Sequence, residues 1–422
     1  MQSIKIVDFG SSRGRGVITT RQTEAGDVIF SESPLLCCQF SWNRLYGYQA
    51  CDYCMCPLES AEANAKRLTG NQNLVLPYSD CGALPLNITH CPGCGLAFCS
   101  PGCLESARPV YHSLLCENQQ NNPTNPVEKL DEIWRQIHFP PETGTIMILV
   151  RMACACLSAR FLHSPQSQHI ASALETFVSC TEVVGSDGGS AQATISHKLL
   201  RPEFNDSITQ LHRAFVSVLF YLTRKLIHPD APESECLFHL QQAHLDGLLN
   251  IDKFRCALCL LGRNGQGVAT SAFSLWVKTA EKLVSSADHS DKAVQFEELV
   301  KNLYAAMDDH VGPFLDNEGV GLYQFQSLIN HSCDPNAVVK FGGESNRLSV
   351  VALRSIALGE EVTISYLDEC DQFRSRHSRR KFLSANYLFW CECDKCVTDK
   401  AAGALSETSD EEEDSSEEVA ME

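Results

Sequence analysis

Asn330-His331-Ser332-Cys333 decides the fold of this chain when it is taken together with Cys391-Glu392-Cys393-Asp394-Lys395-Cys396 about sixty residues later. The later stretch offers three thiolates and lacks one ligand for a tetrahedral zinc site, which Cys333 can supply. A closed site of four sulfur atoms would tie the C-terminal end of the chain back onto the Asn-His turn. The sequence therefore predicts that these two distant stretches meet around a metal ion.

The charge of the chain is unevenly distributed. The 422 residues carry a formal net charge of −18, and the last 17, from Ser406 to Glu422, hold nine acidic side chains and no Lys or Arg. Such a segment is predicted to be a disordered acidic tail. The remaining body is only mildly acidic, which argues against direct binding of nucleic acid.

Cysteine is the most unusual component of the sequence. The chain has 22 cysteines, yet Met1 to Lys5 shows no basic-then-apolar signal pattern. We also find no apolar run near the roughly 20 residues that a membrane helix needs, so no membrane association is expected. Without a route to an oxidising compartment, clustered cysteines are metal ligands more often than disulfides.

The pattern along the chain indicates an α+β protein with strands at both ends. Residues 4–36 read as short strands broken by glycine turns, and strand signals return from 319 to 366. Between them, residues 127–310 show apolar positions at helical three- and four-residue steps, for example from Ile146 to Phe161 and from Ile208 to Ile227. A segment rich in Cys, Gly and Pro, residues 51–116, precedes this helical block, and we expect metal to supply its order.

That segment carries eight potential zinc ligands in pairs two to four residues apart, which implies two ions. The ligands are Cys51, Cys54, Cys91, Cys94, Cys99, Cys103, His112 and Cys116. A long insertion, residues 55–90, separates the first pair from the rest. It leaves open whether Cys56 or Cys81 replaces a member of the first pair.

The C-terminal motifs, together with Tyr366 at the end of Gly359 to Ser365, resemble the SET domain of protein lysine methyltransferases with its post-SET zinc site. The eight-ligand segment resembles the MYND zinc finger, and a SET domain split by a MYND finger is the hallmark of the SMYD family. The resemblance covers residues 4–396. The acidic tail and the finger insertion are most like a family member that lacks the C-terminal helical-repeat domain of most relatives, so we expect a more open substrate cleft.

The resemblance implies a SET β-fold split by the finger and by a helical insertion. It divides the chain into an N-terminal SET part (1–50), the MYND-type finger (51–116), a helical linker and insertion region (117–310), the SET core (311–370), the post-SET zinc segment (371–398) and the acidic tail (399–422). Three zinc ions are implied, with one finger site of Cys51, Cys54, Cys99 and Cys103, a second of Cys91, Cys94, His112 and Cys116, and a third of Cys333, Cys391, Cys393 and Cys396.

The resemblance also implies S-adenosylmethionine as methyl donor and the ε-amine of a protein lysine as acceptor. In-line methyl transfer depends on alignment and on exclusion of water, and an apolar channel lowers the pKa of the lysine towards the reactive neutral amine. Tyr366 matches the catalytic tyrosine. Residues that match cofactor-binding or channel positions are Arg13, Arg15, Ser327, Asn330, His331, Tyr366, Tyr387 and Phe389.

Two departures from the family pattern fall in the helical region. A segment that usually reads Asn-Ser-Phe and contacts the cofactor is matched only by Thr270-Ser271-Ala272-Phe273. About 45 residues then separate Phe273 from the next SET motif, which is longer than usual. We therefore expect a remodelled helical insert.

Rival interpretations exist for several of these features. The chain could be a catalytically weak adaptor that acts in transcription through peptide binding by the finger, and Cys-His nucleophilic hydrolysis through His331 and Cys333 is disfavoured because Cys333 is needed as a metal ligand. Scaffolding is favoured over peptide docking as the role of the finger.

The basic run from Arg374 to Lys381 reads as a helix face rather than a nuclear signal, so both nucleus and cytoplasm are expected locations. The expected partners of a monomeric enzyme are histone tails or basic non-histone proteins such as ribosomal proteins.

Overall fold

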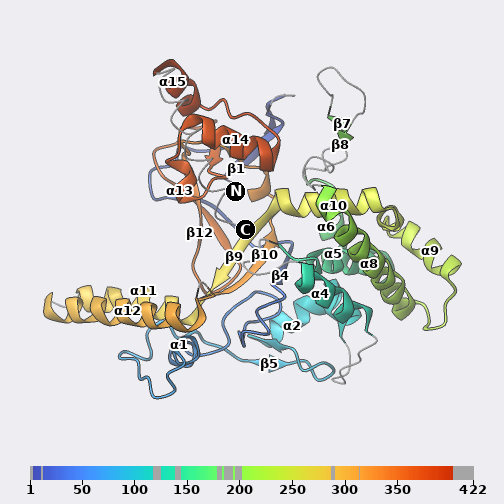
Figure 1. Ribbon diagram of the computed structural model, residues 1–422, viewed down its shortest axis with the longest axis horizontal. Coiled ribbons are helices and arrows are strands. Elements are labelled where there is room, and N and C mark those ends of the chain that lie inside the picture. The colour runs from blue at the N-terminus through green and yellow to red at the C-terminus, as the bar shows by residue number, and fades with distance from the viewer. Residues whose placement is uncertain are drawn as a thin grey trace.

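Three small β-sheets form the centre of the molecule in the computed structural model (Figure 1). The structure describes residues 3–10, 13–116, 125–137, 144–177, 183–184, 193–194, 202–286, 290–312 and 314–402. The first sheet has the order β1-β2-β14-β11, the second β4-β10-β9 and the third β12-β13-β3. The strands of these sheets are β1 (Ile4–Asp8), β2 (Arg15–Thr19), β3 (Val28–Glu32), β4 (Leu36–Gln39), β9 (Gly265–Thr270), β10 (Asn317–Leu322), β11 (Asn330–His331), β12 (Ala337–Phe341), β13 (Leu348–Ala352) and β14 (Glu361–Ile364).

Each sheet joins strands from the two ends of the chain. Val17 of β2 pairs with Val362 of β14, Ser31 of β3 with Ser349 of β13, and Cys38 of β4 with Val320 of β10. The predicted strand-rich ends are thus halves of one β-fold that the intervening residues interrupt. Two-stranded pairs complete the strands, namely β5 (Thr89–His90) with β6 (Ala97–Phe98) and β7 (Val183–Val184) with β8 (Ala193–Thr194).

The helical block lies on one side of the sheets, to the right in Figure 1. Its helices are α4 (Pro126–Ile137), α5 (Met147–Phe161), α6 (Pro165–Leu174), α8 (Asn205–Leu226), α9 (Glu233–Gln242) and α10 (Ile251–Asn264), with short turns η2 (Pro202–Phe204) and η3 (Asp246–Leu249). The helices α5 and α8 confirm the two predicted periodic stretches. Leu149, Ala153 and Leu157 of α5 are fully enclosed, because this helix packs between α6, α8 and the zinc-ligand segment.

The insertion at residues 55–90 has its own packing, which corrects the expectation that metal alone orders residues 51–116. It forms α1 (Ala61–Thr69), whose N-terminal amide at Ala63 is capped by the Ser60 hydroxyl. Leu68 of α1 and Leu76 share an apolar core with Trp276 and Met307 from the long helices α11 (Ala272–Ser286) and α12 (Ser290–Val311). The two unusually long segments of the sequence therefore fold into one unit, the arm to the left in Figure 1.

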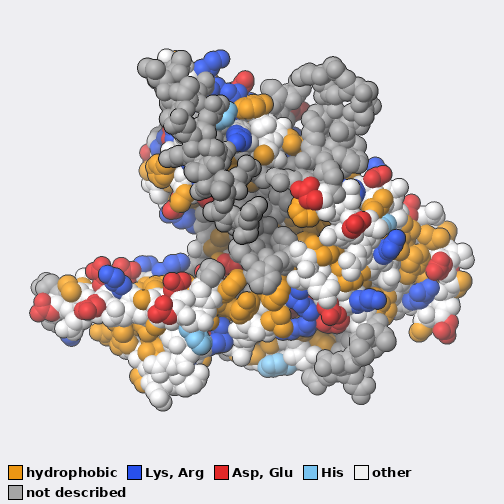
Figure 2. Space-filling model, in the orientation of Figure 1, with side chains coloured by type: hydrophobic (Ala, Val, Ile, Leu, Met, Phe, Trp, Pro, Cys, Tyr) orange, Lys and Arg blue, Asp and Glu red, His pale blue; other side chains and the backbone are white. Residues whose placement is uncertain are grey.

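Close contacts fix this arm. Gly82 has a φ of +70°, and a Cβ there would lie 2.6 Å from the backbone of Leu275. The Trp276 indole donates a hydrogen bond to the carbonyl oxygen of Pro77 over 2.9 Å, and the Asn64 side chain accepts one from the backbone of Phe273 over 3.1 Å. The segment expected to be similar to a cofactor contact, Thr270 to Phe273, thus faces α1. Figure 2 shows that this arm carries interspersed acidic and basic side chains above and apolar ones below.

The remaining helices lie in the cysteine-rich segment or next to the C-terminal motifs. They are α2 (Pro101–Ala107), the π-helical turn η1 (Arg108–His112), α3 (Ser113–Leu115), η4 (Gln326–Leu328), α13 (Glu369–Gln372), α14 (Arg376–Tyr387) and α15 (Asp394–Ala402). The acidic residues 406–422 lie outside the described residues. None of the described helices has the length and apolar character needed to cross a bilayer.

Truncating Trp276 tests whether the arm is held by its own core. Trp276 is fully buried and stacks on Phe273 with ring centroids 5.4 Å apart. Trp276→Ala should lower the free energy of unfolding by about 3–5 kcal/mol, because it leaves a large cavity and an unpaired Pro77 carbonyl. Val294→Ala, at a 62% exposed position of α12, is the matched control for chemical denaturation. Equal stability of both variants would contradict a packed core in the arm.

Candidate active site and metal centres

A parallel strand pair places the Asn-His turn beside Tyr366. In this pair Asn330 lies opposite Thr363 and His331 opposite Ile364, so that Tyr366, two residues past β14, reaches the His331 ring. The Tyr366 backbone N–H donates to Nδ1 of His331 over 2.9 Å. Burial lowers the pKa of His331 to about 4, which keeps the ring neutral and able to accept this hydrogen bond. The turn and the tyrosine are thus positioned by backbone geometry.

The Tyr366 hydroxyl points back into the protein. It donates a hydrogen bond of 2.7 Å to the carbonyl oxygen of Ile329, the residue before the Asn-His turn. Burial raises the pKa of Tyr366 above its usual value, so the phenol stays protonated. With its proton engaged, the hydroxyl presents oxygen lone pairs to the remaining space. Such a group can orient a neighbouring amine or polarised methyl group but is poorly suited to act as a base.

Two aromatic side chains from the end of α14 complete a wall around Tyr366. The ring centroid of Tyr387 lies 4.8 Å from that of Tyr366, and the Phe389 ring meets Tyr366 edge-on at 6.3 Å. Leu388 between them ends α14 in the left-handed conformation, with φ +61°. This strained conformation is uncommon for a branched residue, and it turns both aromatic rings towards the same site.

The loop at Arg13, Gly14 and Arg15 reaches the Asn-His turn through Glu361, a residue not expected from the sequence. Arg13 forms an ion pair with Glu361, and the Asn330 amide donates to the other oxygen of that carboxylate over 2.9 Å. Gly16 permits this approach, since a Cβ there would lie 2.7 Å from Nδ2 of Asn330. The signal available in the sequence was the position of Glu361 on the strand that leads to Tyr366.

Arg15 and Ser327, the other two residues expected to bind the cofactor, lie nearby, but their side chains form hydrogen bonds to other parts of the chain. The exposed Arg15 side chain donates to the carbonyl oxygen of Thr176, and the partly buried Ser327 hydroxyl to that of Gln324 over 3.4 Å. Ser327 lies in η4, directly before the turn. Neither contact tests a role in cofactor binding, so both assignments stay predictions.

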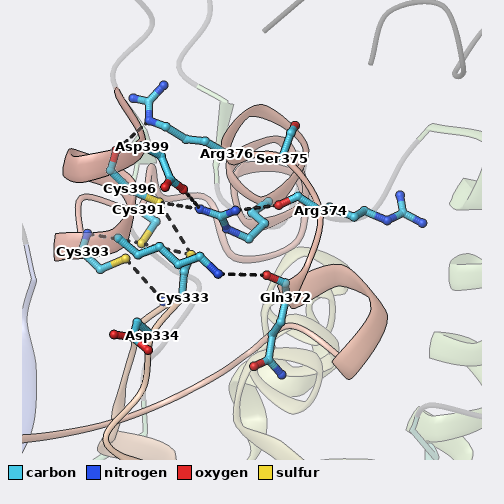
Figure 3. Close-up of polar contacts among 12 residues, drawn as sticks. Cys333, Asp334, Gln372, Arg374, Ser375, Arg376, Cys391, Cys393, Cys396 and Asp399 are labelled. Carbon is cyan, nitrogen blue, oxygen red and sulfur yellow. Dashed lines mark hydrogen bonds and ion pairs between the residues drawn. The ribbon is translucent and has the colours of Figure 1, made fainter. Parts of the chain in front are cut away.

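The four C-terminal cysteines converge on one centre, as Figure 3 shows. The ligand atoms of Cys333, Cys391, Cys393 and Cys396 all lie within 4.8 Å of one another. The Cys333 sulfur is 3.6 Å from that of Cys396 and 3.9 Å from that of Cys391. Zinc–sulfur bonds of about 2.3 Å at tetrahedral angles separate two sulfur atoms by about 3.8 Å. The cluster therefore has the spacing of a zinc site.

A buried arginine lies against this cluster. The Arg379 side chain is 3% exposed, and its guanidinium lies 3.8 Å from the Cys396 sulfur while pairing with Asp399 at 2.7 Å. It also donates to the carbonyl oxygen of Arg374 over 2.6 Å. Four thiolates around Zn²⁺ carry a net charge of about −2, so a fixed cation here stabilises the loaded site. The basic run from Arg374 to Lys381 thus lies in helix α14 from Arg376 onward, as predicted, with Arg374 just before the helix.

The cysteine-rich segment forms two further clusters with the predicted membership. Cys51, Cys54, Cys99 and Cys103 make one, and Cys91, Cys94, His112 and Cys116 the other. Within the first, the sulfur atoms of Cys54 and Cys99 are 3.5 Å apart, and within the second, Nε2 of His112 lies 3.8 Å from the Cys94 sulfur. Cys56 donates to the carbonyl oxygen of Pro57, and Cys81 packs in the arm. The geometry thus favours the original pair over either substitute.

Comparisons with known proteins agree with this arrangement. The model of the SET domain matches residues 14–367. The chain is 37% identical to a chicken protein named protein-lysine N-trimethyltransferase SMYD5 over 96% of this chain and 88% of that protein. It is 36% identical to the human protein of that name, over 94% and 87%. A histone-lysine N-methyltransferase of Arabidopsis thaliana, ATXR2, is 26% identical over 79% and 67%.

Replacing Arg379 tests the electrostatic support of the C-terminal cluster. Arg379→Met keeps the apolar stem but removes the charge, and should weaken zinc retention at this cluster by about 10–100-fold against a competing chelator. Zinc per chain, measured by elemental analysis after dialysis, should fall by one ion. Lys400→Met, an exposed charge on α15, is the control. Unchanged zinc affinity in Arg379→Met would show that the guanidinium only fills space.

Proposed function

The chain belongs to the SMYD group of SET-domain protein-lysine methyltransferases, and from this we propose which of its residues carry the transfer and which proteins receive the methyl groups. The enzyme transfers methyl groups from S-adenosylmethionine to lysine. The donor supplies an activated methyl on a sulfonium. Everything else that the reaction needs is the alignment and desolvation of the amine by protein side chains.

We propose Tyr366 as the catalytic residue because two hydrogen bonds hold it in place. Its backbone N–H is fixed to His331 and its hydroxyl to the carbonyl of Ile329. We infer that the oxygen lone pairs face the space beside Tyr387 and Phe389, whose rings lie 4.8 and 6.3 Å from that of Tyr366. An apolar aromatic channel there disfavours the charged ammonium and lowers the pKa of an entering lysine, which promotes the neutral nucleophile.

Asn330, His331 and the Arg13 loop are proposed to hold the methyl donor, with Ser327 and Arg15 at the edge of its site. The residues present fit such a zwitterionic ligand: Gly14 has nothing within 4 Å of the position of a Cβ, and the exposed Arg13 guanidinium can turn from Glu361 to a ligand carboxylate. Glu361 would then remain bound to Asn330 and keep the amide oriented. This network adds Glu361 to the residues expected from the sequence.

We assign zinc to all three clusters and a scaffolding role to the MYND-type segment 51–116. In support, backbone carbonyls of its first ligand loop are bound from the SET sheets and from the helical block. The Asn346 backbone N–H donates to the carbonyl oxygen of Cys54 over 2.8 Å. The buried Arg151 of α5 donates to the carbonyl oxygen of Asp52 over 2.9 Å and also pairs with the Asp52 carboxylate at 2.7 Å. Loss of that metal would disturb both neighbours, whereas a detachable peptide-binding module needs few such bonds.

Histone tails or basic non-histone proteins such as ribosomal proteins are the proposed substrates, reached by a monomer in nucleus and cytoplasm. The relatives support a lysine acceptor, since mouse SMYD3, 47% identical over 89 residues, is named a histone-lysine N-methyltransferase. The mildly acidic body suits basic partners.

Tyr366→Phe tests the catalytic assignment. It removes only the hydroxyl, so methyl transfer to basic proteins should fall by about 100-fold or more, while calorimetric affinity for S-adenosylmethionine stays within about 3-fold of wild type. Tyr78→Phe, at a 42% exposed tyrosine of the insertion, is the matched control. If labelled methyl transfer is equal in wild type, Tyr366→Phe and His331→Ala, the adaptor hypothesis becomes the better one.

We also propose that the product is trimethyllysine, because the SMYD5 relatives are named protein-lysine N-trimethyltransferases. Under single-turnover conditions followed by excess donor, intact mass spectrometry of a substrate peptide should show +14, +28 and then +42 Da species, with the last accumulating. A reaction that stops at +14 Da with donor still present would refute trimethylation by this enzyme.

A further inference from the structure

A carboxylate at the end of β3 holds the segment that leads into the Asn-His turn. Glu32 is the last residue of β3. Its carboxylate accepts the backbone N–H of Phe325 at both oxygens, over 3.0 and 3.2 Å, and the N–H of Gln326 over 3.1 Å. The partners are 293 and 294 positions apart in the chain, so this contact joins the two halves of the SET fold. None of the motifs that carry the transfer site includes Glu32.

The backbone groups that Glu32 binds open the short turn η4. This turn begins at Gln326, and its N-cap residue Phe325 provides no side-chain hydrogen bond. The first N–H groups of a helical turn have no partner within it, so buried ones need an acceptor from elsewhere. Glu32 supplies that acceptor from another strand. At the other end of the turn, the Ile329 N–H donates to the Gln326 carbonyl oxygen over 3.1 Å, which links the residue that Glu32 holds to the residue before Asn330.

The turn η4 also packs against β3 through apolar side chains, and the carboxylate adds what this packing lacks. Leu328 and Ile329, which are 4% and 1% exposed, share a core cluster with Ile29 of β3. Apolar contacts favour burial but have no preferred direction, so they tolerate small rotations of a short turn. Hydrogen bonds weaken steeply when they are bent, so three of them to one carboxylate fix the orientation of the turn. The Ile329 carbonyl oxygen, which accepts the Tyr366 hydroxyl, is oriented with it.

The charge of Glu32 is compensated by these backbone groups rather than by a cation. None of the ion pairs among the described residues includes Glu32. Burial raises the pKa of the Glu32 carboxyl, and hydrogen bonds from the backbone of Phe325, Gln326 and Gln324 act in the opposite direction. A carboxylate accepts at both oxygens, whereas an amide of the same shape accepts at only one. The contact is therefore specific for an acidic side chain.

We propose that Glu32 is a positioning residue for the methyl donor, because it fixes the orientation of η4 and thereby of Asn330 and His331. The inference rests on the proposed function, which assigns the Asn-His turn to S-adenosylmethionine. Without Glu32, η4 keeps its apolar contacts but loses its orientation, so part of the binding energy of the donor must restore it. Tyr366 is held independently by its backbone bond to His331 and by the Tyr387 ring. Donor affinity should therefore depend on Glu32 more strongly than turnover of the bound donor does.

Two variants of Glu32 give a graded test by calorimetry with S-adenosylmethionine on the full chain. Glu32→Gln preserves the shape and one acceptor oxygen, and should weaken donor binding by about 5-fold or more. Glu32→Ala removes both acceptors and should weaken it by about 30-fold or more. The KM for the donor should rise in parallel, while kcat at saturating donor stays within about 3-fold of wild type. Equal donor affinity in wild type and Glu32→Gln would overturn the proposal.

A merely structural role for Glu32 predicts a different result. Both variants would then unfold at lower denaturant concentration, but the folded protein would bind the donor with wild-type affinity. Asp27→Asn is the matched control, because the Asp27 carboxylate accepts the backbone N–H of Glu24 over 3.1 Å at the turn before the same strand. It should leave donor affinity at the wild-type value, and an equal loss there would count against Glu32. If Glu32→Ala does not fold, as judged by zinc content and circular dichroism, Glu32→Gln decides the outcome.

Asn330→Ala separates failure of this inference from failure of the proposed function. Weaker donor binding in Asn330→Ala, with unchanged binding in Glu32→Gln, would keep the donor site and refute only the role of Glu32. Unchanged binding in Asn330→Ala would refute the donor site itself, and the role of Glu32 with it. The double variant should lose less affinity than the product of the two single losses, because both substitutions act through the same turn. Fully independent losses would contradict that coupling and overturn the proposal.

Discussion

The parallel pairing of β11 with β14 is the contact on which the transfer site depends. It brings His331 beside Tyr366 although 35 residues separate them, and the Cys333 cluster then fixes the end of α14 against the same turn. Because the aromatic pair Tyr387 and Phe389 directly precedes the cluster, one group of four cysteines positions both the Asn-His turn and the aromatic wall beside Tyr366. Disruption of this cluster would thus disturb the turn and the wall together.

The scaffold around this contact is strongly non-local. Val17 pairs with Val362, so most of the chain must be accommodated before the first sheet is complete. Such topologies fold slowly, and local metal clusters and self-contained cores reduce the number of long-range contacts that must form at once. The helical block and the zinc-ligand segment, which share one core, provide such units, whereas the arm joins α1 to helices about 200 positions later in the chain.

Charge at the edges of the SET sheets is organised by buried or partly buried pairs. Glu361 joins Arg13 to Asn330 at the transfer site, Asp52 joins Arg151 to the cysteine-rich segment, and Arg379 lies against the C-terminal thiolates. Glu32, Asp316 and Glu318 depart from this rule, because burial raises the pKa of each and none of the ion pairs among the described residues includes any of the three.

Strand and helix periodicity predicted the α+β class, and cysteine spacing predicted two ions in residues 51–116 and one that joins Cys333 to the C-terminal cysteines. The resemblance to SMYD proteins supplied the division of the finger ligands into two sites and the residues expected around the transfer site. Ligands two to four residues apart can share an ion whatever the rest of the chain does, so zinc sites of this kind can be predicted from sequence spacing alone. The role of Glu361, the placement of Arg379 and the common core of α1, α11 and α12 required the tertiary structure. Each depends on residues that are distant in the sequence, from 17 positions for Arg379 and Cys396 to 209 for Asn64 and Phe273. Burial of an apolar face also carries no sequence mark of the partner that covers it.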